Sequence, residues 1–145
     1  MNNEVRVEFD AISENEAFAR IAAAAFITPL NPTLEEIADV KTAVSEAVTN
    51  AIIHGYEGKP GKVWLSCRLA ERRLHIEVQD KGKGIEDVEK AMEPLFTTKP
   101  ELDRSGMGFS FMEAFMDSLQ VNSEPGSGTT VIMEKYFAPD AADEA

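Results

Sequence analysis

The segment from Thr33 to Gly55 has the pattern of one long amphipathic helix, and this pattern constrains the fold more than any other part of the sequence. Its first residues, TLEE, have the form of a capping box in which Thr33 and Glu36 satisfy each other's backbone amides. Apolar residues then recur at helical spacing and form one stripe: Ile37, Val40, Val44, Ala47, Val48, Ala51 and Ile52. A helix with a single apolar stripe has to bury it against a second layer of structure.

Other segments can supply that layer. Alternation of apolar and polar residues predicts strands near 4–10, 63–69, 73–79, 119–124 and 129–136. Further helices are expected near 13–26, near 86–92 and from 108 to 118, the first with a capping box of Ser13 and Glu16. Because helices and strands come in blocks, we predict an α+β fold, a two-layer α/β sandwich. Its sheet is expected to be mixed or mostly antiparallel, with helices on one face.

The length of 145 residues suits a single domain, which we place at residues 1–138. Residues 85–107 are expected to form a long irregular connection interrupted by Pro94 and Pro100, and connections of this length in compact domains are usually functional or mobile. Residues 139–145 are acidic and rich in alanine, and we expect them to be a disordered tail.

Composition and charge exclude several classes of function. The 14 basic and 26 acidic residues give a net charge of −12, which repels a phosphate backbone and disfavours nucleic-acid binding. The single cysteine, Cys67, allows no disulfide within the chain and has the setting of a small buried residue in a strand. No leader pattern or apolar run long enough to cross a bilayer occurs, so a soluble, cytoplasmic protein is expected.

Three polar residues line up along the predicted long helix. Glu46, Asn50 and His54 span only about 80° of the helix circumference, outside the apolar stripe. A solvated helix face would explain them. However, asparagine is a poor residue for a helix interior, and the neighbours on this line are small enough to let a ligand approach: Ala43, Ala47 and Ala51.

Three glycine-containing motifs follow. In DKGKG, Asp80 ends a predicted strand beside Gly82 and Gly84; this is either a plain turn or a carboxylate placed to accept a hydrogen bond from an exocyclic amine such as that of adenine. In RSGMGFSF, two glycines open a helix whose free amides would attract phosphate, unless Ser105 simply caps the helix. GSGTT, residues 126–130, is most simply a hairpin turn.

The order and spacing of these motifs resemble the GHKL, or Bergerat-fold, ATPases, the group of DNA gyrase and the histidine kinases. That order is Glu-x-x-x-Asn on a helix, Asp-x-Gly-x-Gly, a long connection, Gly-x-Gly before a helix, and Gly-Thr-Thr before a final strand. A P-loop motif and the HRD and DFG motifs of common protein kinases do not occur in the sequence.

The resemblance implies a role for each matching residue. Asn50 would ligate a Mg²⁺ ion that bridges the ATP phosphates, and Glu46 would be the general base. Asp80 would hold the adenine amino group, with Thr130 assisting through water. Residues 93–107 would form an ATP lid. The remaining residues of the implied nucleotide site are His54, Gly82, Gly84, Thr97, Thr98, Lys99, Arg104, Ser105, Gly106, Met107 and Gly108.

Four stretches narrow the resemblance to the sporulation anti-sigma factors, which are serine kinases of this group: NEAFAR, EAVTNAIIHGY, EPLFTTKPELDRSGMGF and GTT. It implies use of Mg·ATP with ADP as product, inhibition of the sporulation sigma factor F, and phosphorylation of a serine on an anti-anti-sigma factor. A homodimer and partner docking near Arg20 are also implied. Two alternatives stay open: a nucleotide-gated sigma-binding module without significant catalysis, which the presence of Glu46 disfavours, and the catalytic domain of a histidine kinase.

Overall fold

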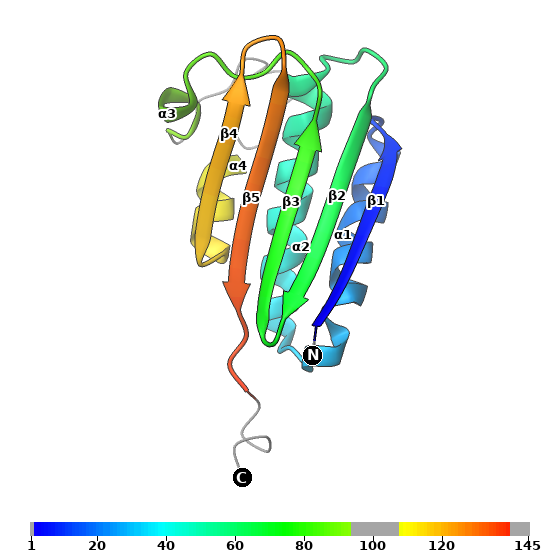
Figure 1. Ribbon diagram of the computed structural model, residues 1–145, viewed down its shortest axis with the longest axis vertical. Helices are drawn as coiled ribbons and strands as arrows, with labels where there is room; N and C mark the ends of the chain where they lie inside the picture. The colour runs from blue at the N-terminus through cyan, green and yellow to red at the C-terminus, as the bar shows by residue number, and fades with distance from the viewer. Residues whose placement is uncertain (1, 94–107, 140–145) are drawn as a thin grey trace.

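A five-stranded antiparallel sheet forms one layer of the protein (Figure 1). The computed structural model describes residues 2–93 and 108–139. The strands lie in the order β1-β2-β3-β5-β4, with these bounds: β1 Asn2–Asp10, β2 Lys62–Ala70, β3 Arg73–Asp80, β4 Ser118–Glu124 and β5 Gly128–Tyr136. Every neighbouring pair in this sheet is antiparallel, which agrees with the mostly antiparallel sheet expected from the sequence.

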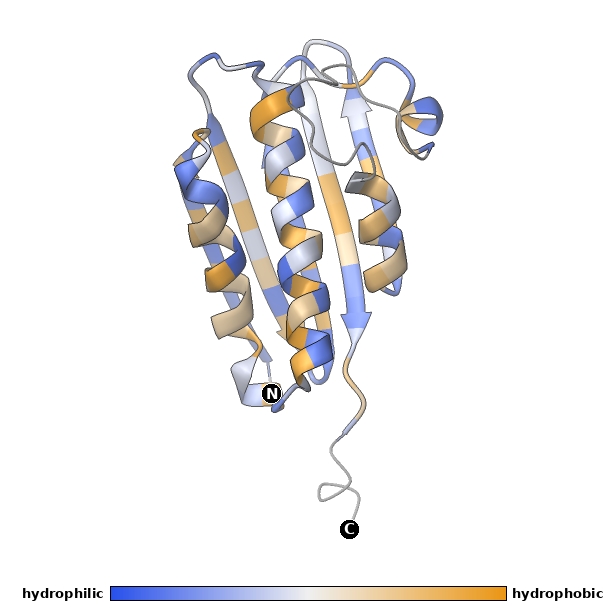
Figure 2. Cartoon of the chain, turned by 180° about the vertical axis from the view of Figure 1, so that it is seen from behind, coloured by the Kyte–Doolittle hydropathy of each residue, from blue (hydrophilic) through white to orange (hydrophobic). Residues whose placement is uncertain are grey.

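Three helices cover one face of the sheet and form the second layer (Figure 2). They are α1 (Glu14–Phe26), α2 (Leu34–Asn50) and α4 (Gly108–Phe115). A short 3₁₀ turn at Thr28–Leu30 joins α1 to α2, and the short helix α3 (Val88–Ala91) packs near β4. The predicted two-layer α+β sandwich is confirmed. No helix within residues 2–93 and 108–139 is long and apolar enough to cross a membrane.

The core lies between the sheet and the helices, with α2 at its centre. The predicted apolar stripe of α2 is confirmed, since Val40, Val44 and Val48 are fully buried. Alternate residues of the strands face this stripe, and fully buried examples are Leu65 and Ile76. Burying a side chain of this size contributes about 1.5–3 kcal/mol, so these contacts are the main force that holds the two layers together.

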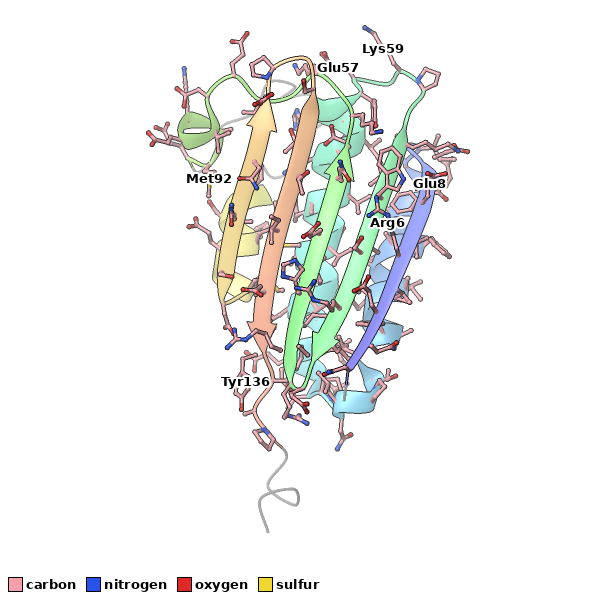
Figure 3. All side chains as sticks on the ribbon, in the orientation of Figure 1. Arg6, Glu8, Glu57, Lys59, Met92 and Tyr136 are labelled. Carbon is pink, nitrogen blue, oxygen red and sulfur yellow. The ribbon has the colours of Figure 1, made fainter. Side chains whose placement is uncertain are left out.

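The other face of the sheet carries polar and charged side chains (Figure 3). On β1, Arg6 and Glu8 point to this outer face, and Glu8 accepts a 2.7 Å hydrogen bond from the indole nitrogen of Trp64 on β2. This pattern of one apolar and one polar face is typical of antiparallel sheets that are covered on one side only.

The two predicted capping boxes have different outcomes. Thr33 forms the complete box with Glu36: its hydroxyl accepts the Glu36 amide at 3.1 Å, and its own amide donates to the Glu36 carboxylate at 2.8 Å. The box at Ser13 is wrong. Ser13 has helical backbone angles, φ −57° and ψ −33°, and its side chain makes no cap bond, whereas an N-cap hydroxyl needs an extended backbone to reach the helix amides. The Glu16 carboxylate instead contacts Ser45 of α2 and Arg20.

We predict that Thr33→Ala lowers the free energy of unfolding by about 1 kcal/mol, because the Glu36 amide at the start of α2 loses its hydroxyl acceptor. Ser13→Ala is the matched control and should change stability by less than about 0.5 kcal/mol. Urea denaturation followed by circular dichroism measures both. Equal losses in the two variants would contradict the assignment.

Candidate functional site

A cavity of about 580 Å³ opens at the end of the sandwich where β3 ends and β5 begins, the upper end in Figure 1. Segments far apart in the sequence form its wall, namely the ends of α2 and β3, the loop after β3, α3, and the start of α4. Its apolar lining includes Ala47, Ala51, Val78, Ile85, Phe109 and Val131. Its size and mostly apolar wall are typical of pockets for small molecules.

The polar line of α2 reaches this cavity. Asn50 and His54 line it, and Glu46 lies one turn back along the helix. Gly108, the first residue of α4, packs directly on these groups: a Cβ built there would lie 3.1 Å from Glu46 Oε2 and 3.3 Å from Asn50 Nδ2. A carboxylate, a carboxamide and a helix N-terminus therefore converge at one place, and a glycine makes that approach possible.

The last turn of the long helix is a π-turn. Residues Ala51–Gly55 leave the α-helical pattern, and the amide of Tyr56 donates to the carbonyl of Ala51 at 3.2 Å. The sequence pattern predicted an uninterrupted helix here, because a π-turn has no compositional signature of its own. The wider turn ends with His54 and Gly55 in the cavity wall, and such turns are frequent at functional sites.

Asp80 is a buried carboxylate at the opposite side of the cavity. It is the last residue of β3 and only 5% exposed, and its Oδ1 accepts the Gly82 amide at 2.8 Å. Burial raises the pKa of Asp80 to about 6, and backbone hydrogen bonds from Gly82 and Thr129 oppose this shift. At neutral pH the cavity therefore holds a poorly solvated anion that gains from an additional hydrogen-bond donor.

The two glycines after Asp80 are required by close backbone contacts. A Cβ at Gly82 would lie 2.1 Å from the carbonyl oxygen of Gly55, and Gly82 itself does not line the cavity. Gly84 lines the cavity and has φ +76°; a Cβ there would lie 2.1 Å from the carbonyl oxygen of Glu124. Both positions thus exclude larger residues, and they let the loop fold tightly beside Asp80.

The structure places Thr129, and not the expected Thr130, at the cavity. Thr129 pairs with Asp80 across β3 and β5, is 8% exposed, and lines the cavity. Thr130 pairs with Gln79 and does not line it. Successive side chains of a strand point to opposite faces, so a motif match that is off by one residue selects the wrong face. The Thr129 hydroxyl lies 2.8 Å from that of Ser123.

Several expected site residues lie outside the described part of the chain. They belong to the predicted lid and the glycine motif after it: Thr97, Thr98, Lys99, Arg104, Ser105, Gly106 and Met107. Most of the expected tail, residues 140–145, also lies outside it. Arg20 lies on α1, 3.2 Å from the Glu16 carboxylate, and borders a separate hollow of about 290 Å³ with Lys41 and Ser45.

Sequence reasoning did not identify the apolar slot of the cavity. Val78 precedes Asp80 by two residues on β3, Val131 follows Thr129 by two residues on β5, and Ile85 follows the glycine loop; all three line the cavity. The period of two along a strand could have indicated Val78, because it shares a face with Asp80. The slot, with the buried carboxylate of Asp80 beside it, suits a flat heteroaromatic ring that carries an amino group.

The opposite end of the cavity suits a hard cation and an anion. The side-chain oxygens of Glu46 and Asn50 are donors of the kind that Mg²⁺ prefers, and the first residue of α4 presents a helix N-terminus beside them. Among residues 2–93 and 108–139, no three His, Cys, Asp or Glu side chains gather in a way that could hold a metal. A metal here would depend on ligands that come with it, such as phosphate and water.

Comparisons with known proteins agree with this arrangement. The histidine kinase-like ATPase domain matches residues 10–135. The anti-sigma F factor of Clostridium acetobutylicum is 59% identical over 138 residues, which cover 95% of this chain and 96% of the relative. That of Bacillus subtilis is 52% identical over 143 residues, 98% of each chain. The solved catalytic domain of the histidine kinase ThkA has a TM-score of 0.56 at 20% identity, over 94% of this chain and 99% of that one, and shows a shared fold.

We predict that Asp80→Asn stabilises the ligand-free protein by up to about 3 kcal/mol at pH 8, because it removes a buried charge whose cost is about 1.4 kcal/mol per unit of pKa shift. The native pKa is raised, so the cost of the charge is fully present above pH 6 and disappears as the pH falls towards 4. The gain should therefore shrink over that range in urea titrations. Glu4→Gln, at an exposed position on β1, should show no such gain, and a gain independent of pH would contradict the prediction.

Proposed function

The chain belongs to the histidine kinase-like ATPase family, on the branch of the anti-sigma F factors, and from this premise we propose a serine kinase that also binds a sigma factor. It binds Mg·ATP in the cavity and transfers the γ-phosphoryl group to a serine of a partner protein. One cavity joins Asp80, beside an apolar slot, to Asn50 at the start of α4, and Glu46 lies one helical turn behind Asn50; this arrangement supports the proposal.

Adenine occupies the apolar slot in this proposal. Its 6-amino group donates to the Asp80 carboxylate, which keeps a low solvent exposure and is ionised at neutral pH. Val78 and Val131 contact the ring, and the Thr129 hydroxyl assists through water in the role that the sequence resemblance gave to Thr130. An analogue that lacks the amino group would bind more weakly, because it would leave the buried Asp80 carboxylate without a hydrogen-bond donor.

The triphosphate lies towards α4, where the Asn50 side-chain oxygen would hold Mg²⁺. The close packing of Gly108 on Glu46 and Asn50 supports this fit, because it brings oxygen donors and a helix N-terminus together. The cation supplies neutralisation of the negative charge that builds up on the phosphates during transfer. ADP remains in the same slot as the product.

Glu46 acts as the general base. Its carboxylate takes the proton of the attacking serine hydroxyl, while the phosphoryl group passes from the β-phosphate oxygen to that serine oxygen. A base of this kind contributes roughly 10²–10⁴ in rate. Its position one helical turn from Asn50 keeps the base and the metal ligand at a fixed separation on a rigid element.

The acceptor is a serine on an anti-anti-sigma factor, and the second partner is the sporulation sigma factor F. Relatives that are 52–59% identical over nearly their full length carry the name anti-sigma F factor, and this supports the proposal. The protein acts as a homodimer, and Arg20, at the hollow between α1 and α2, takes part in partner docking. The net charge of −12 supports protein partners over nucleic acid.

The alternative is a nucleotide-gated sigma-binding module without catalysis. The packing of Glu46 beside Asn50 and Gly108 favours the kinase, because a binding module needs no carboxylate there. Incubation with γ-labelled ATP, a sigma factor and an anti-anti-sigma factor separates the two. Label on a partner serine supports the kinase, and ATP-dependent sigma binding without label supports the module.

We predict that Glu46→Gln binds Mg·ATP with nearly unchanged affinity. It should transfer phosphate at least about 10²-fold more slowly, because the proton acceptor is lost. Glu113→Gln, an exposed position on α4, is the matched control and should retain full transfer. Calorimetry measures binding, and labelled phosphoserine measures transfer. Full transfer by Glu46→Gln would remove Glu46 from the mechanism.

Asn50→Ala should weaken ATP binding at least about tenfold when Mg²⁺ is present, and much less when the ion is chelated, since the lost ligand serves the metal. Asn122→Ala makes the same change at an exposed position on β4 and should leave both affinities unchanged. Titrations with and without a chelator provide the comparison. An unchanged response to Mg²⁺ in Asn50→Ala would assign the ion to other ligands.

A further inference from the structure

Tyr56 directly follows Gly55 of the cavity wall, and its hydroxyl lies between two backbone groups. It accepts the Lys81 amide at 2.8 Å and donates to the Lys62 carbonyl at 2.5 Å. Lys81 directly follows Asp80. The hydroxyl therefore makes one connection between β2 and the first peptide after the buried carboxylate.

The strand register shows what this connection replaces. Ala70 and Arg73 flank the two-residue turn between β2 and β3, and the pairing continues to Val63 opposite Asp80. In an antiparallel pair every second pair of residues is directly hydrogen-bonded, so counting from the turn makes Lys62 and Lys81 the next bonded pair. Tyr56 inserts its hydroxyl into that position. The two strands part there, and the chain turns into the glycine loop.

Gly55, the residue before Tyr56, contacts the glycine loop after Asp80 at a second point. The Gly55 carbonyl accepts the Lys83 amide at 2.9 Å, and a Cβ at Gly55 would lie 2.9 Å from Asp80 Oδ1. Residues 55 and 56 thus fix the loop at Lys81 and Lys83, one on each side of Gly82. The chain that continues from here, with Glu57 and Lys59, lies at the upper end of Figure 3.

We propose that Tyr56 is a positioning residue for adenine recognition: its hydroxyl fixes the Lys81 peptide and so the direction in which Asp80 presents its carboxylate. The inference rests on the proposed binding of adenine by Asp80. The hydroxyl and the ring have separate tasks. The ring packs against Gly61, where a Cβ would lie 2.3 Å from it, and phenylalanine would keep that packing. Only the hydroxyl joins Lys81 to Lys62.

Tyr56→Phe leaves the Lys81 amide and the Lys62 carbonyl without their shared partner. Water can then take the place of the hydroxyl, and this change reorients the peptide after Asp80. The consequence is specific to the 6-amino group, because the apolar slot and the phosphate end do not depend on this hydroxyl. Loss of purine selectivity is therefore expected, and not a uniform loss of affinity.

The test compares Mg·ATP with the Mg complex of purine riboside triphosphate, which lacks the 6-amino group, by calorimetry on the full chain. The native protein should prefer ATP. In Tyr56→Phe the affinity for ATP should fall about three- to tenfold while that for the analogue changes less than about twofold. Tyr136→Phe, the same change at the far end of the sheet and 49% exposed, should match the native protein for both nucleotides.

Amide hydrogen exchange supplies a readout that needs no nucleotide. In Tyr56→Phe the Lys81 amide should exchange at least about tenfold faster, while the Ile76 amide inside β3 stays unchanged. Equal loss of affinity for both nucleotides, unchanged ATP affinity, or unchanged Lys81 exchange would each overturn the positioning role. Equal affinity of the native protein for both nucleotides would instead show that Asp80 makes no hydrogen bond to the 6-amino group. The proposed adenine contact would then be wrong, together with this inference.

Discussion

The close backbone contact between the end of the long helix and the end of β3 is the constraint on which the candidate site depends. Gly55 and Gly82 lie so close together that a Cβ on Gly82 would overlap the Gly55 carbonyl. The Gly55 carbonyl also accepts a hydrogen bond from the Lys83 amide. The contact joins the element that carries Asn50 to the one that carries Asp80. Apolar burial between the two layers sets the general arrangement, but this contact sets the distance between the two ends of the cavity.

Two features of the candidate site are unfavourable for the stability of the fold. A carboxylate is kept 5% exposed with its pKa raised, and the long helix gives up its regular pattern for a π-turn just where it enters the cavity wall. Such features reduce the stability of the ligand-free protein and persist where the surrounding structure enforces them. A ligand that donates to Asp80 recovers part of the cost, so binding and stability are coupled through the same residue.

Local patterns predicted much of this molecule. The Thr33 cap, the apolar stripe of α2 and the strands follow from residue type and spacing, because these depend on neighbours within a few positions. The capping prediction that was wrong is one for which the same local pattern fits two arrangements: Ser13 has the composition of a cap but a helical backbone. The predictions for residues 94–107 stay predictions.

The sequence by itself determined the two-layer architecture and indicated the polar residues of the site, because hydrophobic periodicity and the order of motifs are properties of the chain alone. Only the tertiary structure decided which of those residues meet. The pairing of β3 with β5 selected Thr129 over Thr130, and the packing of α4 on α2 brought Gly108 against Glu46. The role of Tyr56 also appears only there, because its two partners, Lys62 and Lys81, become neighbours through strand pairing and not through their places in the sequence.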